Sequence, residues 1–195
     1  MKLICNSGYY KNFKHQLNYL SKSTASHSSL TIDNHSSCKI KKNNDGSSKV
    51  KRGLKITNKS IIFEKKYWSI MSEHDGYSKK YGIIHNRQIE FFADQNKFLG
   101  TDKLIKKRNF KKSNFEIRFH LMPNIKVMKT QNNESIFIEL ENEGWKFTCD
   151  NHIIDIESGL FLGEKNSYKE NQNIFISGMT HRENQIIKWE LIKIT

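Results

Sequence analysis

Residues 115–124 read FEIRFHLMPN, and polar and apolar side chains alternate through this segment. Successive side chains of an extended strand point to opposite faces, so Glu116, Arg118 and His120 share one face. The other face carries four apolar side chains, those of Phe115, Ile117, Phe119 and Leu121. This two-residue period is typical of a β-strand with one buried face. We expect the polar face to be either solvated or the floor of a polar groove.

The same pattern continues on both sides of this segment. From Lys49 onward, the chain consists of β-branched and aromatic runs bounded by Asn, Asp, Gly or Lys. Examples are YGIIHNRQIEFFAD (81–94), NKFLGTDKLIKKRNF (96–110), ESIFIELENEGWKFTCD (134–150) and NQIIKWELIKI (184–194). The spacing of these runs predicts about ten to twelve strands and an all-β chain, either an antiparallel sandwich or a barrel.

The chain of 195 residues has the length of one domain, and we expect a single domain over residues 1–195. Within it, residues 1–48 are the less regular part and residues 49–195 the strand-rich part. A short helix or an ordered loop is expected over residues 11–22, and SSLTID (28–33) reads as a short strand. KNNDGSSK (42–49) reads as an exposed turn, because Asn, Asp and Gly tolerate turn conformations.

The chain is basic, with a formal net charge of +13. A charge of this size favours polyanionic partners such as nucleic acid, anionic lipid or acidic polysaccharide. Only five of the 33 basic residues are Arg, the better residue for bidentate phosphate contacts. No motif typical of a nucleic-acid-binding β-domain is present, so we expect no nucleic-acid partner. Base composition of the genome is an alternative source of the charge, since Lys, Asn and Ile share AT-rich codons.

Several classes of protein are disfavoured by missing motifs. No apolar run approaches the roughly 20 residues of a membrane span, and the start MKLICNSGYYKN has no secretory signal. The chain as written would therefore be cytoplasmic. The sequence contains no Gly-rich phosphate loop and no GxSxG elbow. Cys5, Cys38 and Cys149 are odd in number and widely spaced, so we expect free thiols rather than disulfides or a zinc ribbon.

Two polar clusters are candidates for a functional site. In STASHSSLTID (23–33), His27 lies between hydroxyl residues just before a strand. HDGYSKKYGIIHNR (74–87) brings together His74, Asp75, Tyr77, Tyr81, His85 and Arg87. An Arg could neutralise a carboxylate while a His or Tyr takes a neighbouring proton, and His with Asp could bind a metal. The spacing leaves three alternatives open: a catalytic site, a binding site or a structural polar cluster.

Read together, eight segments resemble the C-terminal β-sheet region of heparinase II/III-like polysaccharide lyases, in order and over about residues 3–191. They are STASHSSLTI (23–32), HDGYSKKYGIIHNRQIEF (74–91), GTDKL (100–104), FEIRFHLMPNIKV (115–127), EGWKF (143–147), SGLFLG (158–163), ISG (176–178) and IKWEL (187–191). The resemblance implies a β-sandwich, and β-elimination on a uronic-acid polysaccharide outside the cytoplasm or in the cell envelope. In that chemistry a base removes the proton beside the uronate carboxylate, and an acid protonates the leaving oxygen.

The resemblance also suggests site residues. His27 matches the His of a family element and is the candidate catalytic residue and metal ligand. Asn6, in CNSG, matches a position that often carries Asp or Asn, and as a neutral amide it is a weaker ligand for a divalent zinc or calcium ion. His74, Tyr77, His85 and Arg87 match an element that we expect to line the substrate cleft.

Members of the family are longer, with an N-terminal α/α toroid that supplies much of the catalytic set. The chain therefore resembles a C-terminal fragment. We expect it to be inactive alone and to need an acidic polysaccharide and a separately encoded toroid as partners. The alternative is a stand-alone module that binds acidic glycans through its positive charge and Trp68, Trp145 and Trp189. For these three tryptophans, core packing is the competing interpretation.

Overall fold

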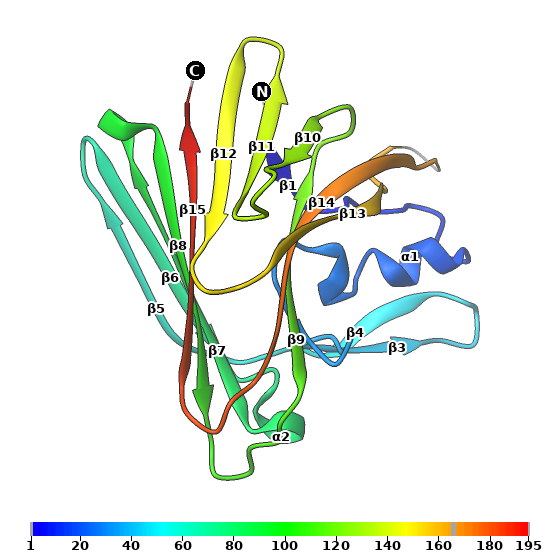
Figure 1. Ribbon diagram of the computed structural model, residues 1–195. Helices are drawn as coiled ribbons and strands as arrows, with labels where there is room; N and C mark the ends of the chain where they lie inside the picture. Colours follow the sequence, from blue (N-terminus) through cyan, green and yellow to red (C-terminus); the bar gives the residue numbers. More distant parts are fainter. Residues whose placement is uncertain (1, 165–166, 195) are drawn as a thin grey trace.

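The computed structural model describes residues 2–164 and 167–194 and shows two antiparallel sheets that face each other (Figure 1). The larger sheet has eight strands in the order β10-β11-β12-β15-β8-β7-β6-β5. Their bounds are β5 Ile56–Phe63, β6 Tyr67–His74, β7 Ile83–Phe92, β8 Lys97–Lys106, β10 Lys126–Lys129, β11 Ser135–Leu140, β12 Glu143–Cys149 and β15 Gln185–Lys193. The prediction of an all-β antiparallel sandwich is confirmed.

The smaller sheet is built around the segment with the clearest alternation. Strand β9 (Asn114–Leu121) pairs on one side with β14 (Lys169–Met179), which in turn pairs with β13 (Ile154–Phe161). On its other side, β9 pairs with two short strands in succession, β2 (Leu30–Ile32) and β1 (Ile4–Cys5). Residues Phe115–Ile117 of β9 pair with β2, and residues His120–Leu121 pair with β1, so two separate pieces of the N-terminal segment share this side of the strand.

The N-terminal part contains α1 (Gln16–Leu20), the 3₁₀ turn η1 (Thr24–Ser26) and the hairpin of β3 (Lys39–Lys42) with β4 (Ser48–Arg52). Two short elements connect strands of the large sheet: α2 (Ser78–Tyr81) between β6 and β7, and the 3₁₀ turn η2 (Ala93–Gln95) between β7 and β8. The helix over 16–20, the strand in SSLTID and the turn between β3 and β4 agree with the predictions. In the described part of the chain, no helix has the length and apolar character that a membrane crossing requires.

The core lies between the two sheets because each contributes one apolar face. Phe115, Ile117, Phe119 and Leu121 of β9 are all at most 2% exposed. Phe119 packs edge-on against Trp189 of β15, with ring centroids 4.8 Å apart. Burying a large apolar side chain contributes about 1.5–3 kcal/mol, so the alternation of β9 supplies much of the force that joins the sheets.

The polar face of β9 is neither a solvated surface nor an open groove over its whole length. Arg118 forms ion pairs with Glu116 and Glu157, at 2.8 and 2.7 Å. His120, by contrast, is 3% exposed, because the N-terminal segment covers it. Its Nε2–H donates to the Ala25 carbonyl at 2.9 Å, and its Nδ1 lies 3.2 Å from the Ser7 hydroxyl.

Candidate functional site

A buried ionic cluster joins four neighbouring strands of the eight-stranded sheet. Asp102 of β8 is fully buried and accepts hydrogen bonds from three side chains. The donors are His85 Nε2 at 2.6 Å, Arg87 Nε and Nη2 at 2.7 and 3.0 Å, and Trp189 Nε1 at 3.0 Å. Burial alone would raise the pKa of Asp102, but the charge of Arg87 and these hydrogen bonds outweigh burial and hold that pKa well below its ordinary value.

The strand register explains why these side chains meet. His85 and Arg87 lie two residues apart on β7 and so point to the same face. Arg87 is directly opposite Asp102 on β8, and His85 is directly opposite His74 on β6. Directly opposite residues on an antiparallel pair project to the same face of the sheet, so the cluster follows from pairing alone.

The hydrogen bonds fix the ring protons of the two histidines. The Gly76 amide donates to His74 Nδ1 at 3.2 Å, so neutral His74 carries its proton on Nε2. That Nε2–H donates to His85 Nδ1 at 3.2 Å, and His85 donates from Nε2 to Asp102. Burial, with a further contribution from the neighbouring His85, lowers the pKa of His74 to about 4. The arrangement keeps both rings oriented and His74 neutral near pH 7.

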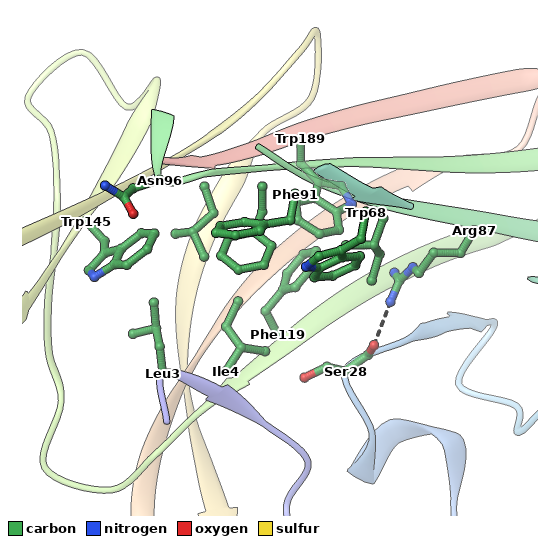
Figure 2. A pocket seen from close by; sticks show the side chains of 13 residues that line it. Leu3, Ile4, Ser28, Trp68, Arg87, Phe91, Asn96, Phe119, Trp145 and Trp189 are labelled. Atoms are coloured by element: carbon green, nitrogen blue, oxygen red, sulfur yellow. Dashed lines mark hydrogen bonds between the residues drawn. The ribbon is translucent and has the colours of Figure 1, made fainter. Parts of the chain in front are cut away.

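An aromatic pocket lies directly beside this cluster and shares Arg87 and Trp189 with it. Figure 2 shows both side chains in the pocket wall. The pocket has a volume of about 470 Å³ and lies between the inner face of the large sheet and β1. Its lining is mainly apolar and comprises Leu3, Ile4, Ser28, Trp68, Arg87, Ile89, Phe91, Asn96, Phe98, Phe119, Trp145, Trp189 and Leu191. Arg87 is the charged residue of the wall, and its Nη1 donates to the Ser28 carbonyl at 2.6 Å (Figure 2).

The apolar surface continues from the pocket onto the edge of the large sheet. Phe63 and Ile61 of β5 pair with Trp68 and Ile70 of β6, and Trp68 lines the pocket, so all four point to this side. Phe63 is 83% exposed, Ile61 72% and Ile70 48%. The small sheet therefore leaves part of the inner face of β5 and β6 uncovered. A contiguous apolar surface of this kind is typical of an interaction site.

His27 and Asn6, the predicted site histidine and metal ligands, are close together on the N-terminal segment. The Asn6 side-chain oxygen accepts a hydrogen bond from the amide of Ser28, the residue after His27, at 2.9 Å. His27 is partly buried, and this burial lowers the pKa of its imidazole. The pair lies apart from the Asp102 cluster, connected to it through the Arg87 contact with Ser28.

The side chains around His27 do not form a metal site by themselves. Within residues 2–164 and 167–194, no three His, Cys, Asp or Glu side chains come together in a way that could hold a metal ion. His27 and Asn6 are both neutral, and the Asn6 oxygen already has a donor. Zinc and calcium sites use at least three or four protein ligands, usually with carboxylates or thiolates. A metal here would therefore need ligands beyond this pair.

The predicted cleft residues have different environments. His85 is 2% exposed and Tyr77 is 1% exposed, with its hydroxyl donating to the Leu30 carbonyl at 2.6 Å. Arg87 reaches the pocket wall, and His74 is partly buried between His85 and Tyr77. Their role in substrate binding stays a prediction. In this structure, Arg87 is the one of the four that lines the aromatic pocket.

Sequence reasoning missed Asp102, which is the centre of the cluster. Its signal is the only carboxylate in the strand segment FLGTDKLI (98–105). A buried carboxylate is rare unless it is paired, so Asp102 indicates a partner on a neighbouring strand. The sequence also gave no sign that Trp68, Trp145 and Trp189 are neighbours, whereas the structure brings all three to one pocket.

These features define a β-sandwich with a buried ionic cluster beneath an aromatic pocket. The family model "Heparinase II/III-like, C-terminal" matches residues 1–190. The chain therefore belongs to this family, as the resemblance implies. A comparison with curated protein sequences found no match.

Solved structures of lyases share the fold. Heparan sulfate lyase HepC from Pedobacter heparinus matches with a TM-score of 0.78 and 12% sequence identity, over 99% of this chain and 28% of that chain. A heparinase III matches with a TM-score of 0.68 and 14% identity, over 100% of this chain and 28% of that one. This chain thus spans a little over a quarter of the length of these proteins.

Proposed function

We propose that this chain forms the C-terminal β-sandwich part of a lyase that cleaves acidic, uronate-containing polysaccharide by β-elimination. The observation that carries the proposal is the family match over residues 1–190. The shared fold of heparan sulfate lyase HepC, which covers 99% of this chain, supports it.

The reaction sets the requirements for the site. The proton beside the uronate carboxylate is weakly acidic until that carboxylate is neutralised, so elimination needs a cation or donors together with a base. His27 is our candidate for the histidine that this domain contributes. Its lowered pKa keeps the imidazole neutral and able to accept a proton near pH 7. If His27 and Asn6 bind a metal ion, the proposal requires further ligands from outside this pair of residues.

We propose that the chain has no lyase activity by itself and acts with an α/α toroid domain. A catalytic set must be held within about 0.5 Å of its productive geometry, and His27 is the only base that we propose this chain contributes to that set. We place the remaining polypeptide of such a lyase on the uncovered apolar surface formed by Trp68, Ile61, Phe63 and Ile70. Covering it would remove large apolar side chains from water, which favours association.

The test is a lyase assay that follows the ultraviolet absorbance of unsaturated uronates on a panel of uronate polysaccharides. The purified chain is assayed alone and with a separately expressed toroid domain of a heparinase III-like lyase. We expect activity only in the mixture, and loss of that activity in His27→Ala but not in the matched control His181→Ala, whose residue is exposed. Activity of the chain alone, or an unaffected His27→Ala mixture, would contradict the proposal.

A second candidate is a stand-alone module that binds acidic glycans. It is favoured by the convergence of Trp68, Trp145 and Trp189 on one pocket beside Arg87. Trp189 is 5% exposed and belongs to the core, so Trp68 and Trp145 would provide the contact surface. Quenching of tryptophan fluorescence by an acidic oligosaccharide, abolished in Trp68→Ala, would support this function. Unchanged fluorescence at saturating oligosaccharide would argue against it.

For the cellular location, we propose the periplasm or cell envelope, where polysaccharide substrates of this kind occur. Fractionation of cells that express the native gene, followed by detection of the chain in each fraction, tests this location.

A further inference from the structure

A second, basic pocket lies away from the ionic cluster, between α1, the β3–β4 hairpin and α2. Figure 1 shows the hairpin between the two helices. The pocket has a volume of about 910 Å³, within the range of ligand-binding pockets in proteins. Its lining comprises Tyr19, Leu20, Ser23, Ala25, Asn34, His35, Ser36, Ser37, Cys38, Lys39, Ile40, Gly76, Tyr77, Lys79, Lys80, Tyr81 and Lys111.

The positive charge of this pocket is not balanced from within. Lys39, Lys79, Lys80 and Lys111 line it, and no Asp or Glu does. In the described part of the chain, none of these four lysines forms an ion pair with a carboxylate, although other surface lysines do, such as Lys66 with Asp94. Like charges that converge on a concave surface raise the local concentration of anions.

The carboxylates in the adjoining turns point to other partners. Asp33 accepts a hydrogen bond from the Asn114 amide at 2.9 Å, and Asp75 accepts one from the Lys55 amide at 2.8 Å. Each side chain thereby ties a turn to a neighbouring segment. Neither lines the pocket, so both leave its lysines available to an external anion.

One lysine is already oriented toward the pocket wall. Lys80 Nζ lies 2.5 Å from His35 Nε2 and 5.3 Å from the centre of the Tyr81 ring. A lysine ammonium can only donate, so His35 accepts at Nε2 and carries its proton on Nδ1, next to the Tyr81 hydroxyl at 2.7 Å. These contacts restrain the Lys80 side chain and reduce the entropy that it would lose on binding an anion.

We propose that this pocket binds the carboxylate or sulfate groups of an acidic oligosaccharide. The inference rests on the proposed function, which supplies the polysaccharide class, and it adds a binding site that neither His27 nor Arg87 lines. The lysines pair with the anionic groups as point charges. The pocket would hold a part of the polymer distant from the bond that is cleaved.

The aromatic side chains of the pocket favour a glycan over a nucleic acid. Single-stranded nucleic acids bind by stacking their bases on exposed aromatic rings. Here Tyr77 and Tyr81 are 1% and 4% exposed, and Lys42 Nζ lies 4.9 Å from the centre of the Tyr19 ring. These rings therefore offer little surface for stacked bases, whereas charge pairing with sulfate or carboxylate needs only the lysines.

The experiment titrates the full chain with a sulfated heparan sulfate hexasaccharide and measures the Kd by calorimetry. The test variant is Lys80→Gln with Lys111→Gln. The matched control is Lys59→Gln with Lys188→Gln, which removes the same charge from exposed positions on β5 and β15 of the large sheet. Exposed ion pairs contribute up to about fivefold each, so we expect about tenfold weaker binding in the test variant and less than about twofold in the control.

Three other outcomes would overturn the proposal. The first is the absence of binding by the wild-type chain, and the second is an equal loss of affinity in the test and control variants. The third is tighter binding of a thymidine oligonucleotide that depends on the same two lysines, which would make the pocket a nucleic-acid site. Equal thermal unfolding temperatures show that each variant is folded. The lyase assay tests the proposed function separately. Failure of the lysine-pocket proposal is therefore distinguishable from failure of the lyase proposal.

Discussion

Replacement of Asp102 by Asn should destabilise the sandwich more than any other single loss of charge among the ion pairs described. Asn keeps the shape but only one acceptor oxygen, whereas His85 and Trp189 donate to the two different carboxylate oxygens of Asp102. It removes the countercharge of Arg87, whose side chain is only 15% exposed. Removing one partner of a buried ion pair leaves an uncompensated charge and typically costs about 3–5 kcal/mol.

We expect a loss of about 3 kcal/mol for Asp102→Asn, the lower end of that range, because Arg87 still donates to the Ser28 carbonyl. A domain is typically stable by about 5–15 kcal/mol, so the variant should fold but unfold at a clearly lower denaturant concentration. The double variant Asp102→Asn with Arg87→Met removes both charges. This double variant should be at least about 1 kcal/mol more stable than Asp102→Asn alone, since replacing both partners of a buried ion pair is often nearly neutral.

Urea unfolding followed by tryptophan fluorescence measures these differences. The matched control is Asp94→Asn, which breaks the Lys66–Asp94 pair whose side chains are both 64% exposed, and it should change stability by less than about 1 kcal/mol. A loss in Asp102→Asn that is no larger than in this control would refute the reasoning.

The pH dependence gives a second check on Asp102. Because its folded pKa is held below the ordinary carboxyl value of 3.8, the stabilisation is present above pH 3.8 and is lost as the pH falls below it. The difference between the wild-type chain and Asp102→Asn should therefore shrink in acid. A difference that stays constant between neutral pH and pH 3 would show that the carboxylate is not held ionised by the fold.

Three further variants or measurements test other parts of the structure. Gly100→Ala would place a Cβ 1.9 Å from the Trp189 ring and should lower the free energy of unfolding by about 3 kcal/mol. In the control Gly53→Ala, the new Cβ has no atom within 4 Å and should not lower stability. Thermal unfolding compares the two variants. His74 should titrate near pH 4 in an NMR titration. Because this folded-state pKa lies below the ordinary value of 6.5, the stabilisation from neutral His74 is fully present above pH 6.5 and is lost as the pH falls toward 4. Phe63→Ser should reduce the self-association that light scattering measures, because Phe63 is 83% exposed on the apolar sheet face. The free energy of unfolding should change by less than about 0.5 kcal/mol. Unchanged self-association would argue against association of chains through this face.

The sequence alone was sufficient to predict an antiparallel all-β chain, because the period of side chains in an extended strand is local. The choice of a sandwich over a barrel came from the resemblance to the family. The alternation in β9 identifies Phe115, Ile117, Phe119 and Leu121 as one buried face without knowledge of any partner strand. Turn residues mark where strands end for the same local reason. The order of motifs was likewise enough to indicate the family that the match over residues 1–190 shows.

Strand pairing between distant residues could not be predicted in this way. His85 and Arg87 were recognised as sharing a face, but their partner Asp102 lies on another strand, and only the register of β7 with β8 brings the three together. The burial of His120 also depends on residues more than 90 positions away, through its contact with Ala25.

The sequence by itself therefore determined the strand pattern, the basic charge and the family of this protein. The tertiary structure decided which side chains meet: the three tryptophans at one pocket, and four lysines with no carboxylate in another. The physical reason is that periodicity assigns a side chain to a face, whereas charge pairing and pocket shape depend on which strands and turns become neighbours. That choice is made by the packing of the whole chain.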